Sequence, residues 1–201
     1  MYTPRHFEAP SLVAMQALMT SHPLAALVTP TADGLDANHI PLQWHAQEGG
    51  HGVLRGHVAR ANPLVGSALT GDALVIFQGP QAYVSPGWYP GKAQNGKAVP
   101  TWNYLVVHAH GPLRLLDDAA WLREQVRQLS AEHEAGLASP WSVDDAPPDY
   151  IDALLKAIVG IEIPITRLQG KWKVSQNQPG PNRAGVIAAM TQLESLRAAD
   201  S

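Results

Sequence analysis

The chain of 201 residues contains no cysteine, which excludes disulfides and thiolate metal ligands. It also has no apolar run of bilayer-spanning length, and residues 1–7 lack the basic-then-apolar order of a signal peptide. We therefore expect a cytoplasmic protein without a membrane partner. Its formal net charge of −3 does not favour broad attraction to nucleic acid. DNA as a partner would require a local basic patch.

The familiar catalytic motifs are missing as well. There is no nucleophile elbow, no HExxH pattern and no carboxylate pair suited to hydrolysis. Residues 91–97 have the spacing of a phosphate loop, but Ala98 replaces the magnesium-binding hydroxyl residue and Pro100 opposes the helix that should follow. Hydrolase and nucleotide-triphosphatase functions are therefore not supported, and the catalytic residues are unknown at this level.

The apolar pattern predicts a mainly β protein with peripheral helices (α+β). Strands are expected at residues 24–30, 36–45, 51–58, 73–77, 105–115 and 161–168. Helices are expected at residues 10–21, from Asn62–Pro63 to Gly71, and at residues 117–134, 148–159 and about 182–197. Strands clustered in hairpins with helices outside them predict a small antiparallel barrel. We interpret residues 1–201 as a single domain with a helical insertion at about 117–159.

Two segments combine proline, glycine and aromatic residues around one loop, namely residues 79–89 and residues 99–104. Proline fixes φ, and large rings with polar tips favour one apolar side and one hydrogen-bond partner. The segments therefore fit either the wall of a site for a flat ligand or a surface loop held in place by its rings.

Arg60 lies where a strand ends near Val58 and the expected helix begins at Asn62–Pro63. Free N–H groups at a helix start together with a guanidinium suit a phosphate monoester. The alternative is a capped helix with a solvated arginine.

His108 and His110 fall on the same face of a strand, where they could share a metal ion. No Asp or Glu stands beside them in sequence, so hydrogen bonds to neighbouring backbone are the favoured interpretation. We predict no metal site.

With these residues in view, the chain resembles the PaiB family, described as FMN-binding negative transcriptional regulators. The resemblance is carried, in the expected order, by residues 2–7, 38–41 (Asn-His-Ile-Pro), 56–63, 76–80, 82–89, 99–104 and 170–177. These stretches span nearly the whole chain. Residues 178–183 depart from the family pattern, which usually has more charge there.

The resemblance implies a pyridoxamine phosphate oxidase-like split β-barrel, the FMN-binding split barrel, that forms a homodimer with two FMN sites at its interface. By analogy of position, the phosphate would lie near His57, Arg60, Ala61 and Asn62. The flavin ring would lie against the strand Asn38, His39, Ile40 and Pro41, within reach of Gln78. Trp102, Asn103 and Tyr104 would come from the partner subunit, with Lys171, Ser175 and Gln176 as further contacts.

Two functions follow from this resemblance. The first is an FMN-binding, homodimeric negative transcriptional regulator, in which the DNA contact is direct or made through another protein. The second is a flavin-dependent oxidoreductase acting on a small molecule, with His57 or Tyr83 as the nearest approach to an acid or base. A haem-handling relative is a third interpretation, which would use His108 or His110.

Overall fold

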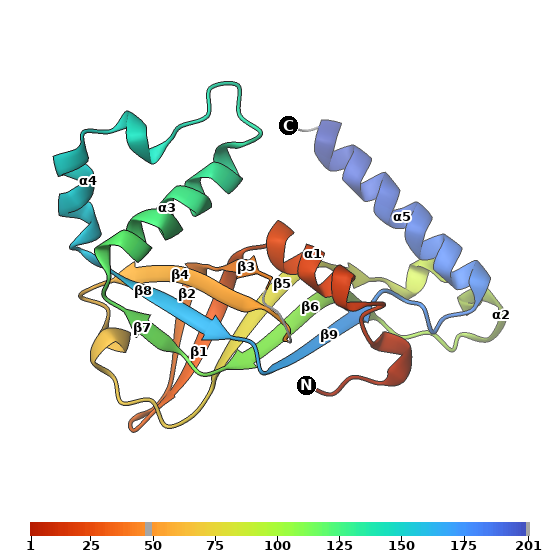
Figure 1. The fold of residues 1–201 in the computed structure, drawn as a ribbon. Coiled ribbons are helices and arrows are strands. Elements are labelled where there is room, and N and C mark those ends of the chain that lie inside the picture. Colours follow the sequence, from red (N-terminus) through yellow and green to blue (C-terminus); the bar gives the residue numbers. More distant parts are fainter. Residues whose placement is uncertain (47–49, 200–201) are drawn as a thin grey trace.

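The computed structural model describes residues 1–46 and 50–199, without the side chains of residues 94–95 and 194–199. In the described residues nine strands form two antiparallel sheets that enclose one core without closing into a continuous barrel (Figure 1), and we call this two-sheet unit the barrel. The larger sheet has the order β2-β1-β5-β6-β9 and the smaller sheet the order β3-β4-β8-β7. The strands are β1 (Leu24–Thr31), β2 (Gly34–Pro41), β3 (Gln43–His45), β4 (Val53–Ala59), β5 (Ala73–Val84), β6 (Thr101–Gly111), β7 (Arg114–Leu116), β8 (Ile158–Pro164) and β9 (Arg167–Lys173).

The helices lie around these sheets, and none of the described ones is long and apolar enough to cross a membrane. The α-helices are α1 (Leu12–Ser21), α2 (Lys92–Asn95), α3 (Ala119–Glu134), α4 (Pro148–Leu155) and α5 (Gly180–Ala199). Single 3-10 turns are η1 (Arg5–Phe7), η2 (Pro63–Gly66), η3 (Pro86–Trp88) and η4 (Val143–Asp145). The expected mainly β architecture with peripheral helices is confirmed.

Three of the expected strands are divided between the sheets. Residues 161–168 divide after Pro164, where β8 ends, and β9 begins at Arg167 in the other sheet. Residues 36–45 were expected to form one strand, but β2 ends at Pro41 and β3 begins at Gln43 in the other sheet. The Leu42 N–H bonds to the carbonyl of Pro23 at this corner, and the Leu42 side chain is fully buried. Residues 105–115 divide at Gly111, where a Cβ atom would lie 1.9 Å from the Pro164 carbonyl oxygen. Only glycine allows the two sheets to approach so closely there.

Helix boundaries also differ from the expectations. The segment after Asn62 is a 3-10 turn that ends at Gly66 and not a helix that reaches Gly71, because Gly66, Ser67 and Thr70 are weak helix formers. α4 ends at Leu155, and β-branched residues at 158–159 begin β8 instead. The C-terminal helix starts at Gly180, two residues before the expected 182.

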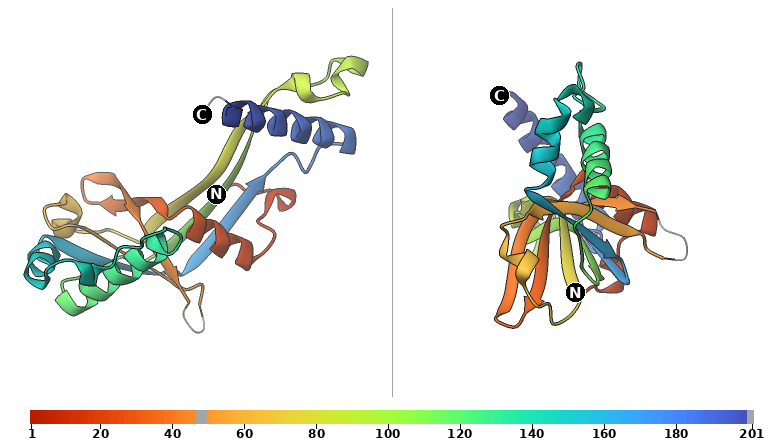
Figure 2. Two further views of the ribbon diagram at one scale, coloured as in Figure 1. Left: turned by 90° about the horizontal axis from the view of Figure 1, so that it is seen from above. Right: turned by 60° about the vertical axis from the view of Figure 1, so that its left-hand side comes forward.

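The expected loop at residues 79–89 is mostly strand. β5 continues to Val84 past an irregularity in its pairing with β6 between Gln78 and Gln81, and η3 follows. β5 and β6 therefore extend beyond the barrel as a ribbon, with α5 lying alongside (Figure 2). We call this ribbon, the turns at its tip and α5 the arm.

Candidate functional site

A groove of about 470 Å³ lies between α5, β6 and the end of β9. Most of its wall is apolar, and its polar groups come from a few side chains. The lining residues are Pro80, Gln81, Ala82, Asn103, Tyr104, Leu105, Val174, Ser175, Gln176, Arg183, Val186, Ile187 and Met190. A concave, mainly apolar space with a few convergent polar groups is typical of a small-molecule site.

The floor of the groove is held by a buried hydrogen bond between two strand ends. Ser175 Oγ donates to Asn103 Oδ1 at 3.0 Å, and both residues are less than a tenth exposed. Ser175 has a φ of +62°, a conformation that a non-glycine residue adopts only where its surroundings hold it. Gln176 Oε1 accepts from the Val174 N–H at 2.7 Å and braces the same turn. The turn that leads from β9 to α5 is therefore fixed.

The roof of the groove is α5, which is docked through an apolar cluster at the tip of the arm. Val84, Tyr89 and Val186 are buried together there. A Cβ atom on Gly185 would lie 2.1 Å from the Trp88 carbonyl oxygen, so glycine allows α5 to lie directly on η3. Arg183 faces the groove from the first turns of α5, and no ion-pair partner is found for it among the described residues.

Lys171 lies beside the groove on the outer face of the larger sheet. Its Nζ donates to the Tyr2 carbonyl at 3.1 Å and lies 5.4 Å from the centre of the Tyr104 ring. Gln78 and Lys171 both pair with Val106, so the three residues form one row across the sheet. Of the expected cofactor residues, Asn103, Tyr104, Ser175 and Gln176 therefore line the groove, whereas Gln78 and Lys171 lie beside it on the outer face of the sheet.

The other expected residues, apart from Trp102, lie on β2, at the end of β4 and in the turn that follows β4. Asn62 Nδ2 donates to Asn38 Oδ1 at 2.7 Å, and His57 Nδ1 lies 2.8 Å from Gln125 Oε1 of α3. His39 and Ala61 are exposed, Pro41 is partly buried, and Ile40 is only 8% exposed within the core. We call Asn38, His57, Arg60 and Asn62 the barrel-end cluster.

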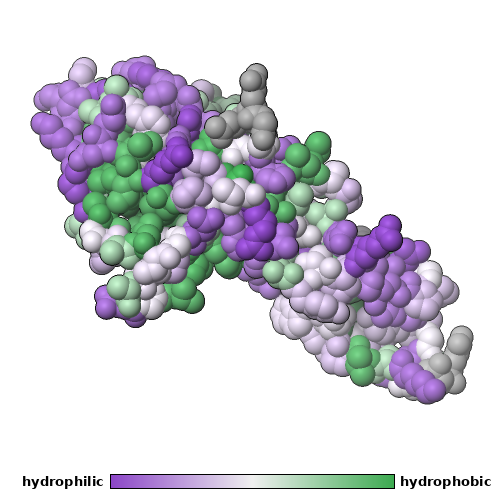
Figure 3. Space-filling view, turned by 60° about the horizontal axis from the view of Figure 1, so that its bottom comes forward, coloured by the Kyte–Doolittle hydropathy of each residue, from purple (hydrophilic) through white to green (hydrophobic). Residues whose placement is uncertain are grey.

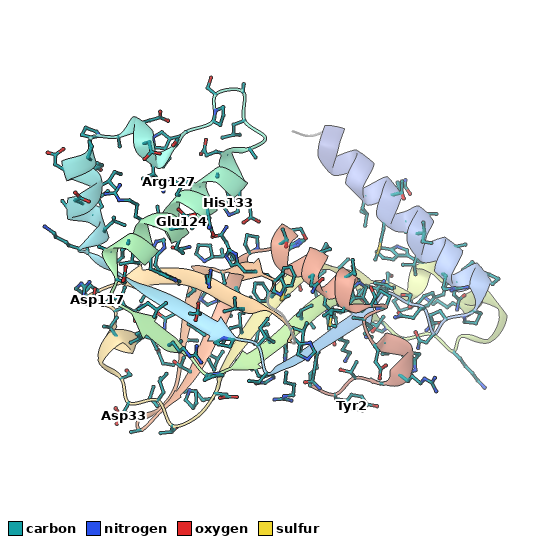
Figure 4. The ribbon with its side chains drawn as sticks, viewed as in Figure 1. Tyr2, Asp33, Asp117, Glu124, Arg127 and His133 are labelled. Carbon is teal, nitrogen blue, oxygen red and sulfur yellow. The ribbon has the colours of Figure 1, made fainter. Side chains whose placement is uncertain are left out.

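Arg60 is largely engaged within the protein. Its guanidinium donates to both carboxylate oxygens of Asp117 at 2.6 and 2.8 Å, and to the carbonyls of Lys156 and Ile158. This pairing raises the pKa of Arg60 and lowers the pKa of Asp117, which lies at the foot of α3 (Figure 4). These bonds use four of the five guanidinium N–H groups, and one remains for a ligand.

Trp102 lies outside the groove, in a neighbouring hollow of about 410 Å³. The hollow is lined by Gln81, Ala82, Tyr83, Trp88, Trp102, Met190 and Leu193. The sequence interpretation missed Gln81, Arg183 and the α5 residues. The α5 residues could have been found from the helical spacing of Val186, Met190 and Leu193, which places them on one face of the helix.

His108 and His110 lie side by side on the outer face of the larger sheet. Burial is the main cause that lowers the pKa of each ring, and the Arg167 cation lowers both further. Arg167 Nη2 lies 3.1 Å from His110 Nδ1. No group of three or more metal-binding side chains is found in the described part of the chain.

Comparison with known proteins identifies relatives across the whole chain. Residues 1–167 match a family model described as "Putative FMN-binding domain". The uncharacterized protein AN0679 of Emericella nidulans is 36% identical, with 94% of this chain and 89% of the relative covered. The protease synthase and sporulation protein PAI 2 of Bacillus subtilis is 30% identical, with 98% and 93% covered.

Solved structures share the fold at low sequence identity. The flavocytochrome Anf3 from Azotobacter vinelandii superposes with a TM-score of 0.58 at 16% identity, covering 90% of this chain and 74% of that one. The FAD and heme binding protein from Mycobacterium smegmatis gives a TM-score of 0.54 at 15% identity, covering 90% and 79%. At these identities the likeness is one of fold.

Proposed function

The chain belongs to the FMN-binding domain family, and on that basis we propose that it is a homodimeric, cytoplasmic flavoprotein of the PaiB type that acts as a negative transcriptional regulator. Bound FMN supplies reversible electron-transfer chemistry.

The groove fits the cofactor. A flavin ring needs apolar walls and a few hydrogen bonds to its edge, and Leu105, Ile187 and Met190 are apolar residues that line the groove. The amide of Gln176 and the Asn103–Ser175 pair supply polar contacts. Arg183 and the remaining N–H of Arg60 are the positive groups available for a phosphate.

A second protomer is needed to complete the proposed site. Asn38 pairs with Leu27, which lies level with Val75 and Ala109 across the sheet. Trp102 is seven residues further along β6, which corresponds to about 23 Å at the usual rise per strand residue. One flavin therefore cannot contact Trp102 and the barrel-end cluster of the same chain closely. We propose that the arm of one protomer meets the barrel end of the other.

The outer face of the larger sheet supplies a surface for such a dimer. The core residues Leu27, Val75 and Ala109 point inward, so their neighbours along each strand point outward. These neighbours include Ala26, Val28, Leu74 and Ile76, with His108 and His110 beside them on β6. In Figure 1 α1, α3 and α4 lie above the barrel strands and α5 lies above the arm, and Figure 3 shows apolar residues gathered mainly over the barrel. A contiguous apolar surface on a sheet is typical of a protein interface.

Charge is unevenly distributed, which bears on the proposed contact with DNA. Residues 117–156 contain nine Asp and Glu but three Lys and Arg, so the rest of the chain carries a net charge of +3. Arg167, Lys171 and Lys173 follow one another on the edge strand β9, and no carboxylate partner is found for them among the described residues. β9 and the arm are therefore the side on which we place a DNA backbone.

A flavin-dependent oxidoreductase is the second candidate. It is favoured by the aromatic hollow, which shares Gln81, Ala82 and Met190 with the groove and so lies where a small substrate would contact the cofactor. The two functions differ in solution. A regulator shifts its promoter fragment with an affinity that falls as salt rises, whereas an oxidoreductase bleaches with NADH or NADPH and reoxidises on addition of substrate.

The shared site is tested by mixing two variants that are each defective in one half of it. Arg60→Ala alters the barrel end and Tyr104→Ala alters the arm, so we expect each homodimer to bind FMN poorly. Mixing equal amounts under exchange gives hybrid dimers in half of the population, each with one intact site. Equilibrium dialysis should then recover about a quarter of the wild-type FMN sites.

Each variant mixed with itself provides the control and should recover no sites. Recovery that never exceeds the sum of the two variants, or light scattering that finds only monomers, contradicts the shared site. Wild-type protein that binds no FMN at all contradicts the proposed function as a whole.

A further inference from the structure

No charged side chain is found among the described residues that line the hollow beside the groove. Its seven residues are Gln81, Ala82, Tyr83, Trp88, Trp102, Met190 and Leu193. The groove, by contrast, contains Arg183. A charged ligand entering the hollow would lose hydration without gaining an ion-pair partner. The lining therefore favours an uncharged ligand.

The walls of the hollow suit a flat ring. Tyr83 and Trp102 meet edge to face, with ring centres 6.0 Å apart at 75°. Both rings are about half exposed, at 48% and 52%, although each has a large apolar surface. Trp88 forms another aromatic wall, and the thioether of Met190 also contacts the space. Aromatic rings and a methionine together accommodate a planar aromatic molecule.

The side-chain amide of Gln81 can fix the orientation of a ligand in the hollow. Gln81 is exposed, and no hydrogen bond of its side chain is found among the described residues. A glutamine amide both donates and accepts. It can therefore pair with a carbonyl or a carboxamide on the ring of a ligand.

We propose that the hollow binds a planar, uncharged aromatic molecule carrying a carbonyl or carboxamide group. The ring lies among Tyr83, Trp88 and Trp102, and the polar group faces Gln81. Binding depends only on these residues. The hollow and the groove share Gln81, Ala82 and Met190, so a molecule in the hollow would lie beside a flavin in the groove. The inference that this molecule is a substrate or effector of the flavoprotein rests on the proposed function.

Two probes of the same shape test the preference for an uncharged ligand. 2-Naphthamide and its charged analogue 2-naphthoate are titrated into the full chain, both FMN-free and FMN-loaded, while tryptophan fluorescence is followed. We expect the amide to bind at least tenfold more tightly than the carboxylate in both forms. Equal affinities, or no saturable quenching by either probe, overturn the proposal.

Leu193→Arg introduces a positive charge into the described lining of the hollow. Leu193 is 42% exposed on α5, so the substitution is compatible with folding and adds a cation to the lining. We expect naphthoate to bind at least tenfold more tightly than it binds the wild type, and naphthamide to bind more weakly. The matched control is Leu12→Arg on α1, where leucine is 41% exposed and does not line the hollow, and it should change neither affinity.

Two further outcomes separate the possible failures. If a second copy of the chain fills the hollow, neither probe binds and Leu193→Arg dissociates the dimer in sedimentation, which overturns the proposal. If wild-type protein binds no FMN but FMN-free protein still prefers naphthamide, the proposed function fails while this inference stands.

Discussion

At the scale of single residues, Arg60 combines a structural role with a possible ligand contact, which the sequence analysis treated as alternatives. Arg60 was interpreted either as a phosphate ligand or as a solvated arginine. In the structure it joins Asp117 at the start of the helical insertion to the backbone carbonyls at 156 and 158. Its position is therefore fixed by the protein, and that fixed position leaves one N–H for a ligand.

The phosphate role of Arg60 predicts a specific change in ligand preference. Arg60→Ala should lower FMN affinity roughly tenfold or more, because a hydrogen bond to a charged group is lost, while riboflavin affinity stays nearly unchanged. Fluorescence titration with both flavins measures this ratio. Arg114→Ala, which removes another exposed arginine, is the control. An equal loss for FMN and riboflavin would mean that Arg60 acts only by positioning the insertion.

The buried pair beneath the groove predicts a loss of stability. Asn103→Ala leaves the Ser175 hydroxyl without its partner, which should cost about 1–3 kcal/mol in urea unfolding. Ser175→Ala tests the same bond from the other side without changing the demand for positive φ. If the pair acts as a unit, the double variant loses less than the sum of the two single variants. Strict additivity would refute the coupling.

At the scale of elements, the position of α5 decides whether a groove exists. α5 covers β6 and the end of β9 because Gly185 allows it to lie against η3 and because Val186 joins Val84 and Tyr89 in the arm cluster. From its sequence pattern alone, α5 would be predicted to be an ordinary amphipathic helix on the surface. Its function as a wall comes from this docking.

Gly185→Ala should therefore displace α5 although alanine is the better helix former. The added Cβ would collide with the Trp88 carbonyl, so we expect faster proteolysis at the C-terminal helix and at least tenfold weaker FMN binding. Gly180→Ala, whose Cβ meets open space in the same helix, is the matched control and should be neutral or stabilising. Identical behaviour of the two variants would exclude close docking as the reason for glycine.

At the scale of the whole molecule, the outer face of the larger sheet bears on two properties, the pH dependence of folding stability and the proposed dimer. The pKa of His108 and the pKa of His110 are both lowered on this face, chiefly by burial. The unfolded chain, with histidine pKa values of about 6.5, therefore binds protons more readily than the folded chain. The associated stability is fully present above that pH and is lost as the pH falls through the lowered values.

Thermal unfolding between pH 5 and pH 8 tests this relation. The melting temperature should fall on acidification, and the fall should be smaller in His108→Gln. His133→Gln, which removes an exposed histidine from α3, is the control and should retain the wild-type slope. If the melting temperature of His108→Gln depended on pH as steeply as that of the wild type, His108 would not contribute to the acid sensitivity of folding.

A charge in the centre of the same face tests assembly. Ile76→Arg should yield monomers in light scattering, because a buried unpaired cation opposes association. FMN binding should weaken with it, because the two halves of the proposed site then separate. Leu35→Arg, near the hairpin tip, should leave the dimer largely intact. A monomer that retains full FMN affinity would contradict the shared site.

Much of this molecule follows from local chemistry. The antiparallel architecture, the peripheral helices and the PaiB-like motifs were predicted from the sequence, and the family resemblance is confirmed. The corners at Leu42 and Gly111 were missed, because period-2 alternation continues through the point where a strand changes sheets. The length of β5 was missed because proline and glycine at 79–80 usually mark the end of a strand.

The sequence by itself determined which residue types were available to hold a flavin: arginine, amides and aromatic rings in recognisable motifs. Only the tertiary structure decided that these groups fall into two distant halves, that Arg60 is committed to Asp117, and that α5 encloses a groove. The reason is physical. Alternation and capping act over a few residues, whereas sheet register and helix docking depend on contacts between residues far apart in the chain.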